Sequence, residues 1–513
     1  MLQDRRTVTI LALGLCLMYI AVRMWGLADS CLWFDEIFSV HAAEHSWSSL
    51  FWFVAQDLVH PPLFYSCLKL WIGIGGESVM WLRLLPVLFA ALALVPFIYL
   101  CKELKLPNSV MLLALTFLAV NGSLTKYTQT LRMYSMLMFL SLLSIWLFAR
   151  YFNRGKSFFP LLVVNLLLIY THYFGWFVVS AEVAAILIFQ RIKWRRMAAM
   201  VGILFAAFLP WIIAVVQAAK AGSDVGQNIS WMSRPALREL IAFIFDLTEP
   251  FYFQASNVEP SSTYKVSIPF LLILLSAMVI YFVNWKSEED KPRIYFLSLF
   301  TIIPAAAAFL ASWVSPYSVW GTRHLIVIYA PAAILLAYFL NCIPVSGIRT
   351  AAITLLLLLS GYGFYLQAVR PTPQYVWCEW ENVANEIKEK ESGDEGLQKI
   401  YVFENLVAYH FWFALRDSDR FKVEVVKGVD VRTDDETYFL PRGFDEVKNT
   451  KLEEIADDEM WLAFRASKAG DEQPILGAFN RFGNQICFAD SEAYGSTTVF
   501  WMKISKSEEG CSK

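Results

Sequence analysis

Charged residues are scarce in this chain: 17% of its 513 residues are Asp, Glu, Lys or Arg, whereas 57% are hydrophobic. A soluble protein of this length needs more charge to cover its surface, so the composition predicts a membrane protein. The formal net charge is only -2. Nucleic-acid binding depends on an excess of positive charge, and we therefore exclude a nucleic-acid partner.

Several motifs that mark common kinds of site are also missing. No two of the eight cysteines have a C-x-x-C spacing, so a zinc or redox motif is unsupported. The sequence has neither a Gly-rich phosphate loop nor an H-E-x-x-H zinc helix. Cys378 and Cys487 both fall in a predicted outer domain, where they either pair with each other or stay as thiols.

The chain instead contains apolar blocks of about 20 residues, the length at which a helix crosses the hydrocarbon core of a membrane. The first block carries no small-residue cleavage site and is interpreted as a retained helix rather than a signal peptide. We predict membrane spans at residues 7–25, 80–100, 108–124, 133–149, 157–171, 173–190, 198–218, 266–285, 293–313, 323–341 and 349–369.

Lys and Arg gather in alternate connections between these spans, beginning with Arg5 and Arg6 before the first. Because cytoplasmic loops are enriched in these residues, we expect a cytoplasmic N-terminus and an extracytoplasmic C-terminal region. The expected fold is mainly α, a polytopic membrane helical bundle of about 11 spans with interfacial helices. One such helix is predicted at 63–74, directly after His60-Pro61-Pro62.

The composition changes at residues 370–373, beyond which charge rises and strand-like runs appear. The predicted domains are a transmembrane domain, 1–369, with a first outer loop at 26–79, and a small extracytoplasmic α/β domain, 370–513. In the second domain we predict a helix at 379–390 and strands at 399–403, 421–426, 437–440, 460–464 and 497–504.

Asp35 and Glu36 form a carboxylate pair just beyond the first span, flanked by apolar and aromatic residues. Adjacent carboxylates near a bilayer are costly to desolvate, which favours a functional role over a solvated loop pair. The pair can act as a general base, hold a divalent metal ion, or do both. Nothing in the spacing demands a metal, and no cofactor is required.

Positive residues also stand on the predicted outer side, where the charge bias disfavours them. Lys126 and Arg132 lie in the second outer loop, and Arg323 and His324 open the tenth span. They suggest a site for an anion such as phosphate, although snorkelling toward the interface also accounts for Lys126. The further candidates for a substrate site are His60, Tyr65, Gln129, Tyr134, His172 and Tyr173, and a lone histidine such as His172 also has a structural interpretation.

These residues belong to motifs that occur in order along the chain. The motifs are Leu32-Trp33-Phe34-Asp35-Glu36, His60-Pro61-Pro62-Leu63-Phe64-Tyr65, Leu82-Arg83-Leu84-Leu85-Pro86, Tyr127-Thr128-Gln129 to Arg132-Met133-Tyr134, Thr171-His172-Tyr173-Phe174-Gly175 and Leu209-Pro210-Trp211. Their order resembles the GT-C membrane glycosyltransferases over most of residues 10–340. The nearest resemblance is to the family 39-like bacterial branch, akin to protein O-mannosyltransferases and the aminoarabinose transferase of lipid A.

The resemblance implies a GT-C-type bundle and a glycosyltransferase of a bacterial inner membrane. Such an enzyme moves a sugar from a polyprenyl-phosphate-sugar donor to an acceptor (a glycolipid, polysaccharide or protein) on the outer face. It implies that Asp35 is the base and that Arg132 matches an arginine found after the third span. Thr130 stands where related sequences commonly have a glutamate, which puts an accessory acid in this loop in doubt.

A polytopic transporter or flippase of a lipid-linked or anionic substrate is the alternative. Transporters usually place ionisable groups near the middle of the membrane and often consist of two matching halves. Here the charges lie at the outer ends of the predicted spans, and the halves show no repeat.

Overall fold

The computed structural model describes residues 5–251, 264–284, 291–369, 375–393, 396–431, 438–480, 485–506 and 511. Its contacts divide the chain into two compact units. The first comprises Met1–Ala28 and Ala42–Pro371, and the second comprises Asp29–His41 and Thr372–Lys513. We expected residues 29–41 in the outer loop of the membrane domain. Their contacts instead group them with the C-terminal residues.

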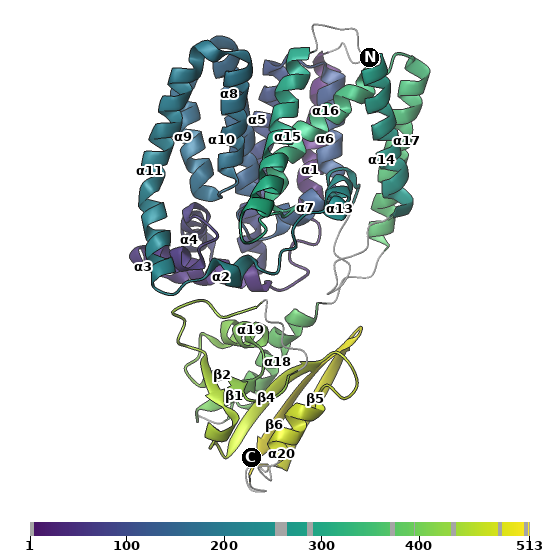
Figure 1. Ribbon diagram of the computed structural model, residues 1–513. Coiled ribbons are helices and arrows are strands. Elements are labelled where there is room, and N and C mark those ends of the chain that lie inside the picture. The colour runs from purple at the N-terminus through teal and green to yellow at the C-terminus, as the bar shows by residue number, and fades with distance from the viewer. Residues whose placement is uncertain are drawn as a thin grey trace. The chain divides into compact units, whose positions relative to one another are not determined.

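The first unit is a bundle of helices (Figure 1). Apolar runs form helices in a membrane because a helix satisfies its backbone hydrogen bonds within one segment. Among the described residues, eight helices are long and apolar enough to cross a membrane. They are α1 (Arg5–Met24), α5 (Val79–Glu103), α8 (Tyr134–Arg154), α11 (Trp194–Lys220) preceded by η1 (Arg191–Lys193), α14 (Tyr264–Val283), α15 (Lys291–Val314), α16 (Tyr329–Asn341) preceded by η2 (His324–Ile328), and α17 (Ser346–Ala368).

Three of the predicted spans form shorter helices, namely α6 (Asn108–Val120), α9 (Phe158–Thr171) and α10 (Gly175–Phe189). The 14 residues of α9 rise only about 21 Å, less than the roughly 30 Å of a hydrocarbon core. In Figure 1, α10 ends well short of the lower end of α11. The turn between α9 and α10 is therefore inside the bundle, and its His172 is buried.

Shorter helices connect these segments: α3 (Trp47–Asp57), α4 (Leu63–Gly75), α7 (Gly122–Gln129), α12 (Val225–Ile229) and α13 (Leu237–Thr248). Helix α4 begins directly after Pro62, as predicted from the proline pair. The expected second outer loop is largely helix α7. Asn121 starts α7 because its Oδ1 accepts the N–H of Leu124 at 2.6 Å and caps the first turn.

A buried polar group joins three of the helices. Asn165 on α9 donates to the Glu182 carboxylate of α10 at 2.7 Å, and the Ser144 hydroxyl of α8 lies 2.6 Å from both side chains. Glu182 has no exposed surface. Polar side chains that bond one another between helices hold a membrane bundle together where the hydrophobic effect is weak.

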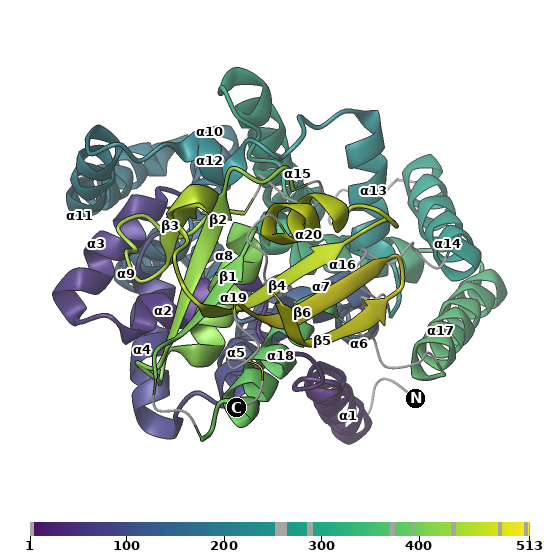
Figure 2. The same cartoon turned by 90° about the horizontal axis from the view of Figure 1, so that it is seen from below.

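The second unit contains a sheet whose described strands follow the order β3-β2-β1-β4-β6-β5 (Figure 2). Strands β1 to β4 pair in parallel, and β6 runs antiparallel between β4 and β5. The strands are β1 (Gln398–Val402), β2 (Phe421–Lys427), β3 (Lys448–Lys451), β4 (Glu459–Ala466), β5 (Gln485–Tyr494) and β6 (Thr497–Ser505).

Helices cover both faces of this sheet. They are α18 (Val376–Lys390), α19 (Asn405–Leu415) and α20 (Gln473–Asn480), with the short η3 (Leu452–Glu454) between β3 and β4. Side chains alternate between the faces of a strand. Leu462 of β4 packs in a cluster with Phe479 of α20, whereas the neighbouring Trp461 donates its indole N–H to Glu391 at the end of α18.

The predicted helix and four of the five predicted strands of this unit are confirmed. The strand predicted at 437–440 is wrong for its described part, 438–440, and Thr437 lies outside the described residues. Tyr438 instead packs its ring on Trp33 at a centroid distance of 5.6 Å. The polar β3 and the exposed β5 were missed because they lack a buried apolar face.

Two disulfides lie in the second unit, Cys31–Cys378 and Cys487–Cys511. Both sequence alternatives for Cys378 and Cys487, a bond between them or two thiols, are therefore wrong. Cys31 stands 347 positions from its partner, and spacing alone gave no sign that the two meet. Helix α2 (Phe34–Glu44) begins just after Cys31 and carries the carboxylate pair.

Candidate functional site

Three histidines from distant parts of the sequence meet in the first unit. His60 precedes α4, His172 lies in the turn between α9 and α10, and His324 begins η2. All three are buried, and one ring nitrogen of each lies within 4.8 Å of the others. The sequence marked each histidine separately, and the structure brings the three together as one cluster.

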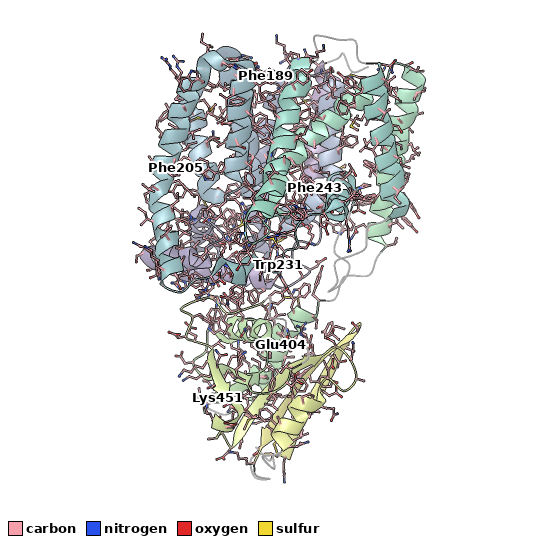
Figure 3. All side chains as sticks on the ribbon, in the orientation of Figure 1. Phe189, Phe205, Trp231, Phe243, Glu404 and Lys451 are labelled. Atoms are coloured by element: carbon pink, nitrogen blue, oxygen red, sulfur yellow. A yellow bond between two sulfur atoms is a disulfide. The ribbon has the colours of Figure 1, made fainter. Side chains whose placement is uncertain are left out.

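Two arginines give the histidine cluster positive charge. Arg132 is 4% exposed, and its Nη2 lies 3.4 Å from both ring nitrogens of His60. Arg323 lies over the ring of Trp231 at 5.3 Å. Figure 3 shows Trp231 toward one end of the helix bundle and Phe189 at the other. We call the three histidines with Arg132 and Arg323 the basic cluster.

His172 is 3% exposed and lies near the charges of Arg132 and Arg323. Because its Nδ1 accepts a backbone hydrogen bond, that nitrogen carries no proton and the ring is a neutral imidazole. A neutral imidazole has one N–H donor and one acceptor nitrogen. Which nitrogen carries the proton decides what this side chain can bind.

A backbone hydrogen bond decides the tautomer of His172. Its Nδ1 accepts the N–H of Phe174 at 3.1 Å, so the single proton of the neutral ring resides on Nε2. Nε2 is buried and has no hydrogen-bond partner among the described residues. His172 thus offers an N–H donor to an anionic oxygen.

The chemistry of the basic cluster suits an anion better than a metal ion. The spacing of the three histidines would allow a metal, but a metal ligand must present an unprotonated nitrogen, and the Nδ1 bond of His172 keeps its proton on Nε2. The guanidinium of Arg132 also repels a cation. Asp35 and Glu36, the metal ligands considered from the sequence, are not members of this histidine group.

Asp57 is a member of the site that sequence reasoning missed. Its Oδ2 lies 2.9 Å from Nδ1 of His60. Asn228 in turn donates to the backbone oxygen of Asp57 and, at 2.9 Å, to its Oδ1. Asp57 therefore fixes the Nδ1–H tautomer of His60. The spacing of three residues between Asp57 and His60 was a usable signal, whereas nothing in the sequence pointed to Asn228.

Tyr134 borders the cluster, and Lys126 is linked to Tyr134 through Tyr127. The ring of Tyr134 lies 6.1 Å from that of His324, and Lys126 lies 5.9 Å from the ring of Tyr127, which also contacts Tyr134. Gly321 leaves the space for His324, because a Cβ at this glycine would come within 2.8 Å of the His324 Nδ1.

Three candidates make contacts that hold the fold. The Gln129 amide donates to the backbone oxygens of Arg23 and Trp25, at 3.1 and 2.7 Å, at the end of α1. The Tyr173 hydroxyl accepts the indole N–H of Trp211 at 3.1 Å. Tyr65 is fully buried, with its ring against Phe64. A substrate role for Gln129, Tyr173 or Tyr65 stays a prediction.

Asp35 and Glu36 belong to the second unit and differ in their surroundings. Glu36 is 2% exposed, and its Oε2 accepts the backbone N–H of Trp33 at 2.9 Å, so it caps the start of α2. Asp35 is half-buried in the first turn of the same helix. Glu36 therefore has a structural task, and a role in chemistry for either carboxylate stays a prediction.

Comparisons with known proteins show the fold. No protein-family model matches the sequence, and no curated protein matches it significantly. Among solved structures, ArnT from Cupriavidus metallidurans bound to undecaprenyl phosphate covers 98% of this chain and 98% of its own, with 12% identity and a TM-score of 0.59. Apo ArnT gives 96% and 97% coverage, 11% identity and the same TM-score.

The archaeal oligosaccharyltransferase AglB from Archaeoglobus fulgidus, in complex with an inhibitory peptide and a dolichol-phosphate, matches at 12% identity with a TM-score of 0.48. The chain spans 63% of the length of that protein, and the match covers 79% of this chain. The helical bundle with its small sheet domain is the fold that this chain shares with ArnT. Over almost its whole length, this chain is similar in fold to ArnT.

Proposed function

We propose that the protein is a membrane glycosyltransferase that takes a sugar from a polyprenyl-phosphate donor and passes it to a lipid, glycan or protein acceptor. The basic cluster carries this proposal: the buried Arg132 and the buried Nε2–H of His172, with the half-buried Arg323, offer donors that suit a phosphate. The fold shared with ArnT, which was solved with undecaprenyl phosphate bound, supports a polyprenyl carrier.

The proposed reaction is an inverting displacement. Asp35 takes a proton from a hydroxyl or amine of the acceptor, which attacks the anomeric carbon of the sugar while the bond from that carbon to the phosphate oxygen breaks. Arg132 and Arg323 stabilise the negative charge that develops on the departing phosphate, and His172 donates a hydrogen bond to it. The membrane holds the prenyl chain.

The distribution of cysteines supports a site on the outer face. Disulfides persist in oxidising compartments outside the cytoplasm, and Cys31 is bonded to Cys378 in the segment that carries Asp35. Cys101 is a buried thiol next to Lys102, on the side that the positive charges assign to the cytoplasm. We place the protein in the inner membrane of a bacterium, with the C-terminal domain outside.

The surroundings of Glu182 do not favour the transporter alternative. Glu182 is the carboxylate in the interior of α10, and Ser144 and Asn165 bind both of its oxygens. A proton or ion path would need such a group to exchange partners, whereas these bonds join three helices.

Lipid binding tests the proposal. Purified protein in nanodiscs is expected to bind undecaprenyl phosphate but not undecaprenol, which has the same chain without the phosphate. Because the phosphate contacts are charged, binding should weaken as salt rises. Equal binding of the two lipids would contradict the proposed use of the basic cluster.

Replacing Asp57 by asparagine is expected to weaken undecaprenyl phosphate binding by about tenfold, in the range found when a partner that orients a histidine is lost. The amide no longer favours the Nδ1–H tautomer of His60 by charge. Isothermal titration in nanodiscs measures the change. Glu77→Gln, which neutralises an exposed carboxylate of the same unit, is the control. Unchanged affinity in Asp57→Asn would exclude the orienting role.

Removing metal ions is expected to leave transfer unchanged. His172 presents an N–H rather than a free electron pair, so a chelator such as 1,10-phenanthroline has nothing to extract from the basic cluster. The rate before and after treatment, with elemental analysis of the same sample, decides the point. Loss of activity on chelation and its return with zinc would instead establish a metal at His60, His172 and His324.

A further inference from the structure

The segment that bears the carboxylate pair is built into the C-terminal domain. Residues 29–41 and 372–513 form one compact unit, although helices α3 to α17 lie between them in sequence. The Cys31–Cys378 disulfide joins them covalently, with 5.4 Å between the Cα atoms. Asp35 follows Cys31 by four residues and lies in the first turn of α2, so the covalent link is close to it in sequence.

Aromatic contacts continue this attachment along the segment. The Trp33 ring lies 4.4 Å from that of Trp377, the neighbour of Cys378 in α18. Phe34 packs on Tyr409 of α19 at 5.1 Å, and the same tyrosine hydroxyl lies 3.0 Å from Nδ1 of His41. The segment is therefore held at its start, at its centre and at its end.

Within α2, the residues that anchor the helix differ from the proposed catalytic residue, Asp35. The buried Ile37 and Val40 occupy the packed side of α2, and Glu36 bonds the backbone at Trp33. Asp35 keeps part of its surface exposed. The attachment thus fixes the backbone of the helix that carries Asp35.

We propose that the C-terminal domain positions Asp35 for catalysis through the Cys31–Cys378 disulfide, which makes transfer sensitive to reduction of this bond. This inference rests on the proposed function. Reduction consumes two thiols of a reagent, releases Cys31 and Cys378 as thiols and yields the oxidised reagent. The segment then keeps only its non-covalent contacts, and the carboxylate departs from the geometry that proton transfer requires.

The positioning role predicts a change in turnover rather than in donor binding. The basic cluster belongs to the other unit, so its affinity for undecaprenyl phosphate is expected to stay the same. The turnover number is expected to fall by about 10- to 100-fold, because small displacements of a catalytic group cost this much. If the disulfide only stabilised the fold, its loss would not lower the turnover number while leaving the affinity for undecaprenyl phosphate unchanged.

The test compares two double variants of the full-length protein. Cys31→Ser/Cys378→Ser removes the proposed attachment, and Cys487→Ser/Cys511→Ser removes the other disulfide of the same unit as the matched control. The measurements are transfer kinetics, undecaprenyl phosphate affinity and hydrogen–deuterium exchange of the peptide covering 33–41. The first variant is expected to lose turnover and to exchange faster at 33–41, and the control should resemble the wild type.

Wild-type turnover in the Cys31→Ser/Cys378→Ser variant would overturn the proposal, as would unchanged exchange at 33–41. If this variant does not fold, the same measurements are made on folded wild-type protein after reduction and alkylation, with mass spectrometry to show which cysteines reacted. If wild-type protein transfers no sugar at all, the proposed function fails. The exchange measurement then still decides whether the disulfide holds the segment.

Discussion

Replacing Asp35 by asparagine is expected to reduce sugar transfer by about 10²- to 10⁴-fold, the contribution of a general base. The amide is nearly the same size as the carboxylate but cannot accept the acceptor's proton at neutral pH. Asp35 is half-buried, so the variant should fold normally and bind undecaprenyl phosphate with wild-type affinity. Single-turnover transfer from a labelled donor measures the chemical step.

Glu36→Gln is the informative companion to Asp35→Asn. Glutamine keeps an oxygen that can accept the N–H of Trp33, and it serves as well as glutamate in a helix cap. This variant should therefore transfer at close to the wild-type rate. Asp29→Asn, at an exposed position of the same segment, controls for the loss of charge. If Glu36→Gln were as slow as Asp35→Asn, the two carboxylates would have to act together.

The second large effect is expected at Arg132. Arg132→Ala should lower transfer by about 10²- to 10³-fold, as for the loss of one donor that stabilises charge in a transition state, and should weaken undecaprenyl phosphate binding as well. Lysine keeps the charge but not the planar fork of donors, so Arg132→Lys should recover part of the activity. Transfer rates and titration of the lipid phosphate measure both effects.

The control for Arg132 is Arg238→Ala, which removes an exposed arginine of the same unit. It should change neither the transfer rate nor the affinity for undecaprenyl phosphate. A transfer rate in Arg132→Ala equal to that of Arg238→Ala would contradict the assignment of the basic cluster to the phosphate.

The membrane helices could be predicted because their signal is local. An apolar run must satisfy its own backbone in lipid, and so a helix lies at each predicted span. Helix α7 was missed because its start depends on one side chain, Asn121, that reaches the backbone three residues on. The polar β3 and β5 acquire their structure from pairing with neighbours, which no pattern within either strand reveals.

The site was predictable in its parts but not in its assembly. His60, His172 and Arg132 each stood in a recognisable motif, yet their mutual distances depend on how α4, α8 and α9 pack. Asp57 escaped notice because one carboxylate beside a histidine motif is common. The attachment of Asp35 to the C-terminal domain depends on a disulfide across 347 positions, which lies beyond any local signal.

Mass spectrometry of the cell envelope tests the central claim most directly. Glycolipids and glycoproteins are compared in cells that lack the chain, in cells that carry it and in cells with Asp35→Asn at equal expression. The account predicts that an envelope molecule loses the mass of one sugar without the chain, regains it with the wild type and does not regain it with Asp35→Asn. Identical envelope masses in all three would contradict transfer of a sugar by this protein.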